Sequence, residues 1–286
     1  MKFRIVTDSS SNVLSIPHED YGCVPMKIVA GKEYVDAPGL NVAQMVEDLK
    51  GYKGKTGSSC PNVGEWLEAF GDAQYVFGIT ITKHLSGSYN AARQAAETYM
   101  EEHPDRRVYL FDSLAAGPEL MMIADKIRQC EAAGDDFDTT VAKVLDYHNH
   151  THTIFCLESM HNLAHNGRVP ITVAKLAGML GIRIIGEAQG GQIVAIHKPR
   201  GEKKAMLAMA QTVKERGFQD GGLIRIAHCF ADDRIQEFMS KIREDFPHAR
   251  FLVEPTTALC SYYAEHGGYI VGFEGGFNVN NDNSKF

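Results

Sequence analysis

Long apolar runs, closely spaced cysteines and an excess of positive charge are all missing from this sequence of 286 residues. No stretch approaches the roughly eighteen apolar residues that a membrane-spanning helix needs, so none is expected. The formal net charge is -7, which argues against nucleic acid as the main partner. The opening residues, MKFRIVTDSSS, have neither the apolar core nor the cleavage site of a signal peptide.

The 6 cysteines are widely scattered, and no two form a CxxC pair. A zinc knuckle and a thioredoxin-type redox motif are therefore not supported. Scattered thiols without a secretion signal are typical of a reducing compartment, so we expect a cytoplasmic protein.

Several catalytic and nucleotide-binding motifs are also missing. The sequence contains no GxGxxG, the motif of dinucleotide-binding folds. It also contains no GxSxG, the motif that carries the nucleophilic serine of α/β-hydrolases. Gly54-Lys55-Thr56 resembles the end of a P-loop, but Leu49 stands where its first glycine is required.

The first half of the chain alternates short apolar strands with helical patterns. Hydrophobic residues make up 44% of the sequence and charged residues 23%, as in folded globular proteins, and the length suits two domains. The alternation predicts an α/β domain over residues 1–150, with a mainly parallel sheet covered by helices on both faces. The predicted strands are Phe3–Thr7, Tyr75–Ile81 and Arg107–Phe111. The predicted helices are Val42–Leu49, Val63–Phe70, Ser88–Met100, Glu119–Ala132 and Phe137–His148.

The second half predicts an α+β domain over residues 151–280, joined to the first near residues 148–153. Gln189-Gly190-Gly191 between two apolar runs indicates a β-hairpin. The tail, residues 281–286, is polar and expected to be frayed. The predicted strands are His152–Leu157, Ile182–Glu187, Gln192–His197, Leu223–His228, Arg250–Val253 and Tyr269–Phe273. The predicted helices are Val173–Met179, Lys203–Arg216 and Arg234–Phe246.

Hydroxyl-bearing residues follow three predicted strands of the first domain. Asp8 to Ser11, Ser86, and Asp112-Ser113 stand at strand ends, where open α/β sheets bind ligands. In ITITKHLSGSYNAA, a helix beginning near Gly87 leaves amides without intrahelical partners. Ser86 suits either a plain helix cap or, with these amides, an anion site. Ser88 is open to the same two interpretations.

Other candidate groups have a structural alternative that we favour. In TGSSCPN, Pro61 is expected to exclude a regular strand and to open the helix near Val63.

His148, His150 and His152 share one face if extended and could bind zinc, but a solvated linker strand is the better interpretation.

Three further polar residues stand at predicted strand ends. Asp8 and Asp112 are expected to cap turns rather than to act as acids or bases. His228 is expected to be a core or interface residue rather than a base.

The chain resembles the DegV family of bacterial fatty-acid-binding proteins, which includes the acyl-carrying subunits of bacterial fatty acid kinase. The resemblance covers essentially the whole chain in order, and LSGSYNAA together with TDSSSN is its most specific part. The matching segments are IVTDSSSN, SSCPN, ITKHLSGSYNAA, FDSLAAG, LESMHNLAHNGRV and PRGEKKAM.

The resemblance implies a carrier with no chemistry of its own. One long-chain fatty acid would lie between two domains, with no metal and no cofactor besides this ligand. Its carboxylate would be bound by Ser58, Ser59, Ser86 and the amides around Gly87 and Ser88. The strand-end hydroxyls described above would then cradle the acid.

The resemblance also implies contacts with a separate kinase, to which the carrier would present the acid. The candidate docking residues are Arg168, Arg200, Lys203 and Lys204. Whether this member has a kinase partner stays open, as does transient contact with a membrane.

The last motif of the family, His-x-Gly-Pro-Gly, corresponds to Glu265-His266-Gly267-Gly268-Tyr269 here. The histidine is displaced by one position, and the proline and the second glycine are missing, so a contact of His266 with the head group is in doubt. A serine- or metal-dependent acyl hydrolase is the alternative function.

Overall fold

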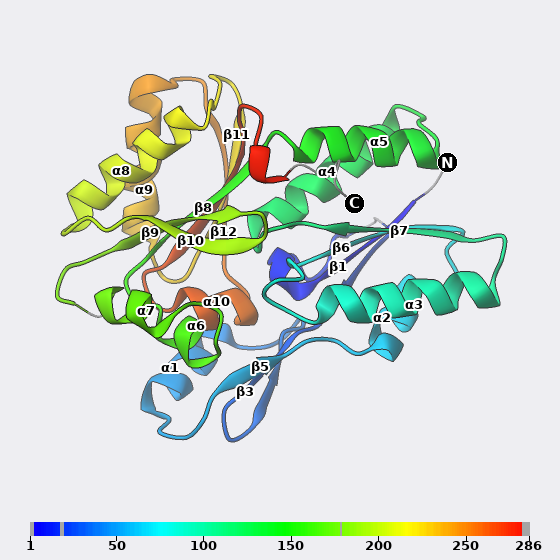
Figure 1. Cartoon of the computed structure of the whole chain (residues 1–286), viewed down its shortest axis with the longest axis horizontal. Helices are drawn as coiled ribbons and strands as arrows, with labels where there is room; N and C mark the ends of the chain where they lie inside the picture. The colour runs from blue at the N-terminus through cyan, green and yellow to red at the C-terminus, as the bar shows by residue number, and fades with distance from the viewer. Residues whose placement is uncertain (1–2, 18–19, 178, 282–286) are drawn as a thin grey trace.

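The computed structural model describes residues 3–17, 20–177 and 179–281. A four-stranded sheet forms the centre of the N-terminal part (Figure 1). Its strands are all parallel, which confirms the predicted α/β architecture. In spatial order they are β2 (Tyr21–Val24), β1 (Arg4–Asp8), β6 (Tyr75–Thr80) and β7 (Arg107–Asp112). Only β2 was not predicted, because Tyr21-Gly22-Cys23-Val24 is short and carries no alternating pattern.

Helices cover both faces of this sheet. One face packs α2 (Val63–Phe70) and α3 (Ser88–Glu102) around the buried rings of Trp66 and Phe70. The other packs α4 (Pro118–Ala132) and α5 (Phe137–His148), where the Phe77 and Phe137 rings stack with centroids 4.7 Å apart. As expected, Pro61 stands shortly before α2, which begins with an Asn62–Glu65 capping box.

The second part is built on a six-stranded mixed sheet, as the α+β prediction requires. Its order is β10 (Gln192–His197), β9 (Ile184–Gln189), β8 (Thr151–Leu157), β13 (Tyr269–Glu274), β11 (Leu223–His228) and β12 (Arg250–Pro255). Only β11 and β12 pair in parallel. One face buries apolar residues of α8 (Glu202–Glu215) and α9 (Asp232–Asp245).

Helix α4 lies between the two large sheets. It contacts β1 and β6 on one side and β8, β11 and β13 on the other. A Cβ at Gly272 of β13 would lie 3.0 Å from Met122 Sδ and 3.1 Å from Pro118 Cβ. The glycine therefore permits close packing between this strand and the first turn of α4.

A small third sheet lies beside the other two and includes predicted site residues. It consists of β4 (Glu33–Val35), β3 (Lys27–Val29) and β5 (Gly57–Ser59), all antiparallel. It packs with α1 (Val42–Gly51) and with α10 (Ala258–Ala264), a helix from the C-terminal part of the chain. The buried Asp36 carboxylate accepts the Ala258 and Leu259 amides at 2.8 and 3.0 Å. The boundary near residue 150 stays a prediction, and α10 packs against elements on the far side of it.

Three local expectations were wrong. Pro61 does not prevent a strand at Ser58 and Ser59, because β5 ends before the proline and pairs with β3. The segment 148–153 is not a solvated linker, since Thr151 is fully buried and His152 nearly so. Asn281, expected in the frayed tail, is also buried, beside the short turn η2 (Val279–Asn281), while residues 282–286 lie outside the described part.

Two short helices complete the described chain, α6 (His161–His165) and α7 (Ile171–Ala177). The predicted helix Val173–Met179 overlaps α7 but begins two residues late, and residue 178 lies outside the described residues. No helix among the described residues is both long and apolar enough to cross a bilayer.

Candidate binding site

A cavity of about 320 Å³ lies where the three sheets meet. Its walls come from both halves of the chain and are mostly apolar, as in small-molecule sites generally. The large apolar side chains are Met26, Ile81, Leu85, Leu114, Phe155, Leu157, Leu163, Ile193, Leu259 and Ile270. The packed sheets therefore leave a pocket suited to an apolar ligand.

Four of the five predicted head-group residues line this cavity: Ser58, Ser59, Ser86 and Gly87. Ser59 and Gly87 are exposed, which places the cavity mouth at these two loops. A Cβ at Gly87 would lie 3.2 Å from Cys60 Sγ, so the loops touch at the mouth. Segments 28 residues apart in the sequence thus meet at one opening.

The N-terminus of α3 shows how Ser86 can serve two roles. Its Oγ accepts the Ser88 amide at 3.2 Å in a local turn before the helix, whose N-cap is Gly87 and not Ser86 as expected. No acceptor for the Ser86 hydroxyl proton is found within the described residues, so this proton is available to a ligand. Ser88 does not line the cavity, and its own hydroxyl donates to Asp8 Oδ2 at 2.7 Å.

Asp8 and the serines after it form a separate buried cluster behind the cavity. Asp8 accepts the Ile81 amide at 3.0 Å and the Ser10 amide at 3.2 Å, besides the hydroxyls of Ser10 and Ser88. Burial raises the pKa of Asp8, although these hydrogen bonds oppose the shift. Asp8 thus caps η1 (Ser9–Ser11), as predicted, and none of these serines reaches the cavity.

The other strand-end acid is also structural. Asp112 accepts the amides of Lys83 and Leu114 at 3.3 and 3.1 Å, as a turn cap does. His228 is nearly buried, and its Nδ1 accepts the Ala231 amide at 3.2 Å. Neither residue lines the cavity.

Arg168 lies in the cavity wall, although the resemblance implied partner docking for it. Its guanidinium is anchored by two carbonyls, those of Leu85 at 3.2 Å and of Asn166. This places a fixed positive charge beside the serine loops.

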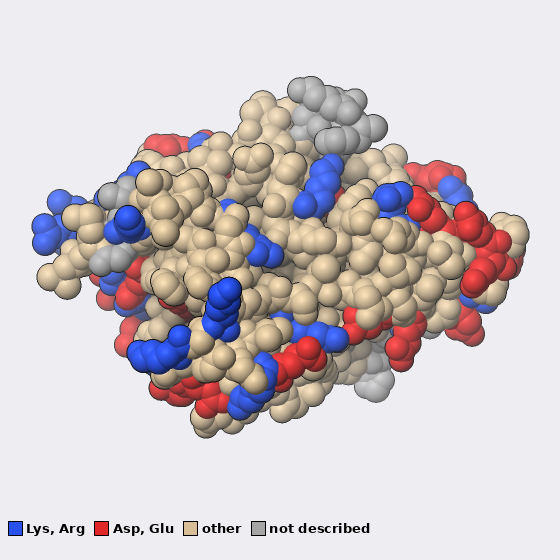
Figure 2. Space-filling view, turned by 60° about the horizontal axis from the view of Figure 1, so that its bottom comes forward, with Lys and Arg blue, Asp and Glu red and all other residues tan. Residues whose placement is uncertain are grey.

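The three other predicted docking residues, Arg200, Lys203 and Lys204, are exposed at the start of α8 and do not line the cavity. Figure 2 shows Lys and Arg over the left and centre of one face, while Asp and Glu predominate at its right end. Asp and Glu also lie among the basic side chains along its lower left edge.

His266 does not contribute to the cavity. It is exposed, and its ring stacks on Phe230 with centroids 5.8 Å apart. Tyr263, three residues earlier in the chain, lines the cavity instead, and its hydroxyl lies 2.7 Å from Ser58 Oγ. Sequence reasoning missed Tyr263 because no motif marks it.

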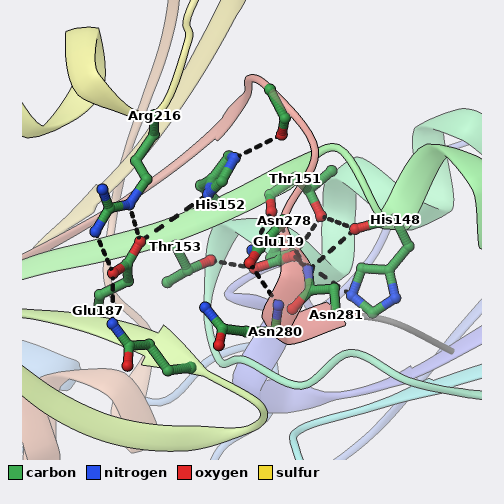
Figure 3. A network of polar contacts seen from close by, with 12 residues as sticks. Glu119, His148, Thr151, His152, Thr153, Glu187, Arg216, Asn278, Asn280 and Asn281 are labelled. Atoms are coloured by element: carbon green, nitrogen blue, oxygen red, sulfur yellow. Dashed lines mark hydrogen bonds and ion pairs between the residues drawn. The ribbon is translucent and has the colours of Figure 1, made fainter. Parts of the chain in front are cut away.

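Thr153 of β8 lines a buried part of the cavity wall. Thr153, Phe155 and Leu157 alternate along the strand and face the cavity over roughly 13 Å. The Thr153 hydroxyl donates to Glu119 (Figure 3), so its proton is bonded within the wall. This part of the wall therefore offers little polarity to a ligand.

Behind Thr153, a polar network joins α4, β8 and the C-terminal segment (Figure 3). Glu119 accepts hydrogen bonds from Thr151 and Thr153 and lies 3.4 Å from His148 Nε2. Burial raises the pKa of Glu119, but its contacts with His148 and the two threonines outweigh burial and lower it. Asn281 donates to the carbonyls of His148 and Thr151 at 3.0 and 3.3 Å.

The three histidines proposed as a zinc alternative do not converge. His148 Nε2 lies 2.9 Å from the Ser113 carbonyl, and His152 Nε2 lies 2.9 Å from the Gly276 carbonyl. The His150 ring packs on Phe277. Each histidine thus contacts a different part of the structure.

The comparisons with known proteins agree on one family. A family model described as an uncharacterised protein of the DegV family matches residues 2–274. A DegV domain-containing protein of Streptococcus gordonii is 35% identical over 280 residues, covering 96% of this chain and 99% of the relative.

Solved structures give the same result. A DegV family protein from Eubacterium eligens, loaded with heptadecanoic acid, is 34% identical with a TM-score of 0.92. The Streptococcus pneumoniae Fatty Acid Kinase (Fak) B3 protein, loaded with linoleic acid, has the same identity and TM-score. Each match covers 96% of this chain and 99% of the solved one.

Proposed function

Because the chain belongs to the DegV family, we propose that it binds one long-chain fatty acid in the cavity, with the carboxylate at the mouth. The observation that carries the proposal is the contrast between the walls of the cavity and its mouth. Apolar side chains line the walls, while Ser58, Ser59, Ser86 and Arg168 gather at the mouth. The fatty acids loaded in the two solved structures described above support the ligand class.

The hydrocarbon tail of the fatty acid supplies most of the binding affinity in this proposal. Burying one methylene is worth about 0.8 kcal/mol, so a tail of about fifteen methylenes contributes ~12 kcal/mol before ordering costs. A hydrogen bond to the charged carboxylate adds about 1.5–3 kcal/mol. The hydroxyls and the Gly87 amide then fix the orientation of the acid rather than its retention.

The protein acts as a carrier without chemistry of its own. An acyl hydrolase would need a base beside a serine, but Ser58 pairs with the Tyr263 hydroxyl and Ser86 with a backbone amide. Among the described residues, no histidine or carboxylate hydrogen-bonds to either serine. The hydrolase alternative therefore has no structural support.

The carrier presents the carboxylate to a separate kinase, and exposed residues at the mouth leave it accessible. Arg200, Lys203 and Lys204, which are exposed, would be the docking residues for this kinase. The similarity to Fak B3 supports this role. Loading requires a transient contact with a membrane, from which the acid enters.

Transfer of a fatty acid from vesicles to the protein tests the binding proposal. Ala188→Trp fills the cavity wall and is expected to abolish uptake, whereas Ala132→Trp, on the exposed side of α4, leaves it unchanged. Equal uptake by both variants would place the lipid elsewhere. Lys203→Glu with Lys204→Glu is expected to keep uptake and to lower use of the loaded protein by a fatty acid kinase.

A further inference from the structure

Two consecutive tyrosines of α10 bond to two alternate residues around β5. The Tyr262 hydroxyl lies 2.7 Å from Thr56 Oγ1, and the Tyr263 hydroxyl lies 2.7 Å from Ser58 Oγ. The two rings pack edge to face with centroids 4.8 Å apart. Only Tyr263 lines the cavity, while Tyr262 is almost fully buried behind it.

Tyr262 fixes the position of its neighbour. Asn166 Nδ2 donates to the Tyr262 hydroxyl at 2.8 Å, and Asn162 Nδ2 donates to the Tyr262 carbonyl at 2.8 Å. The Asn166 carbonyl in turn accepts from Arg168. The same scaffold therefore holds both Tyr263 and the Arg168 guanidinium at the cavity wall.

The Ser58–Tyr263 pair has one hydroxyl proton to spare. Each side chain carries a single O–H, and one of the two protons is used in the bond between them. Whichever group donates within the pair, the other keeps its proton for a ligand acceptor. A hydroxyl that already accepts a hydrogen bond is polarised and becomes the stronger donor.

We propose that Ser58 and Tyr263 act as one unit that donates a single hydrogen bond to the carboxylate of the bound acid, with Arg168 supplying the neighbouring positive charge. This rests on the proposed function and assigns to Tyr263 the head-group contact that His266 does not make. Burial raises the pKa of Tyr263, while its bond with Ser58 and the Arg168 charge oppose the shift. Tyr263 thus stays protonated at neutral pH and able to donate.

The unit predicts a specific pattern of binding losses. Of Tyr263→Phe and Ser58→Ala, the change that removes the hydroxyl donating to the ligand weakens binding of a long-chain fatty acid by about tenfold. The other change removes only the hydroxyl that polarises this donor and weakens binding less. The double variant loses no more than the more weakly binding single variant, because the two side chains serve one hydrogen bond. A fatty alcohol of the same chain length, which lacks the negative charge, is affected much less by each change.

Tyr262→Phe is the matched control. It removes the same hydroxyl from the adjacent residue, which faces Thr56 and Asn166 instead of the cavity. It is expected to lower thermal stability and to weaken fatty acid binding less than Tyr263→Phe does, because it removes no hydroxyl from the cavity. The affinities are measured by displacement of a fluorescent fatty acid from delipidated protein, with folding checked by circular dichroism.

The outcomes separate this inference from its premise. The one-unit proposal would be overturned if the losses of the two single variants multiply in the double variant. It would also be overturned if Tyr263→Phe and Tyr262→Phe bind the acid with equal affinity. Fatty acid binding itself would stand in both cases. If the wild-type protein takes up no fatty acid at all, the proposed function fails and this inference fails with it.

Discussion

Two groups of serines, similar in sequence, have different surroundings in the structure. Ser9, Ser10 and Ser11 are buried, and the protein itself supplies their partners, among them Asp8, Tyr21 and the Met26 amide. Ser58 and Ser86 lie at the cavity mouth and keep donor capacity after their contacts with the protein are made.

The difference shows that a hydroxyl-rich loop is not by itself a binding site. Where a buried carboxylate stands among the serines, their protons are used within the protein, and the cluster stabilises the fold. Where the nearest partner is another hydroxyl or a backbone amide, a proton remains for a ligand. Substitutions in the first group should therefore reduce stability, and those in the second should reduce binding.

The largest effect on stability is expected from Asp8→Asn. An amide in place of the carboxylate turns one acceptor atom into a donor that faces the Ile81 and Ser10 amides or the bonded hydroxyls. Leaving buried donors unpaired costs about 1–3 kcal/mol each, so the loss is expected to exceed ~3 kcal/mol in urea unfolding. Asp112→Asn, at a less buried cap, should cost less. Equal losses would contradict a special role of the Asp8 cluster.

The next largest effect is expected at the back of the cavity, from Glu187→Gln. Arg216 bonds the two carboxylate oxygens of Glu187 at 2.6 and 2.8 Å (Figure 3), so the change should cost roughly 2 kcal/mol. Urea unfolding at pH 7 measures this loss.

The same variant should change the pH dependence of stability. Burial raises the pKa of Glu187, but the bonds from Arg216 and Gln189 outweigh it and lower the pKa below 4.5. The unfolded chain then binds the proton more readily than the folded one. This contribution to stability is full above pH 4.5 and is lost as the pH falls through the folded-state pKa. Glu187→Gln should therefore flatten the acid limb of the stability curve, and an unchanged limb would show that other groups control it.

A comparable effect on stability is expected at the β9–β10 hairpin, from Gly191→Ala. A Cβ at Gly191 would lie 2.3 Å from Thr82 Oγ1, so the hairpin must move away from the loop at the cavity wall. We expect a loss of ~2 kcal/mol and faster exchange of bound lipid. Gly201→Ala is the control, since Gly201 also has a positive φ but nothing lies within 4 Å of its Cβ position. Similar exchange rates in the two variants would show that the hairpin does not restrict exchange.

The smallest effect on stability is expected from Ser86→Ala. The change removes one hydrogen bond to the first amide of α3, worth about 0.5–1 kcal/mol, and one donor at the mouth. Fatty acid retention should fall several-fold in a lipid-exchange assay while folding stays intact. Unchanged retention would leave Ser86 with a role in the local turn alone.

Much of the fold could be predicted from the sequence because its elements follow simple periodicities. The strands Tyr75–Thr80 and Arg107–Asp112 are apolar runs of ordinary length, and α5 has a clear capping residue in Asp136. The strands of the small sheet were missed because each has only three residues, too few to show a period.

The site was predictable only where a motif marks it. Ser58, Ser59, Ser86 and Gly87 lie in segments that match the family, whereas Tyr263 reaches the cavity through the tertiary position of α10. The burial of His148 and His152 could not be predicted from the sequence either, since it depends on Glu119 and on carbonyls distant in sequence. Contacts between distant segments carry no local pattern, so sequence reasoning assigned these histidines to a solvated linker.

Native mass spectrometry of the purified protein, followed by extraction and identification of any released lipid, tests the central claim most directly. The account predicts one long-chain fatty acid per chain, lost from the Ala188→Trp variant and retained by Ala132→Trp. A protein that carries no lipid and also takes up none from vesicles would contradict it. The cavity and its serine mouth would then require a different ligand.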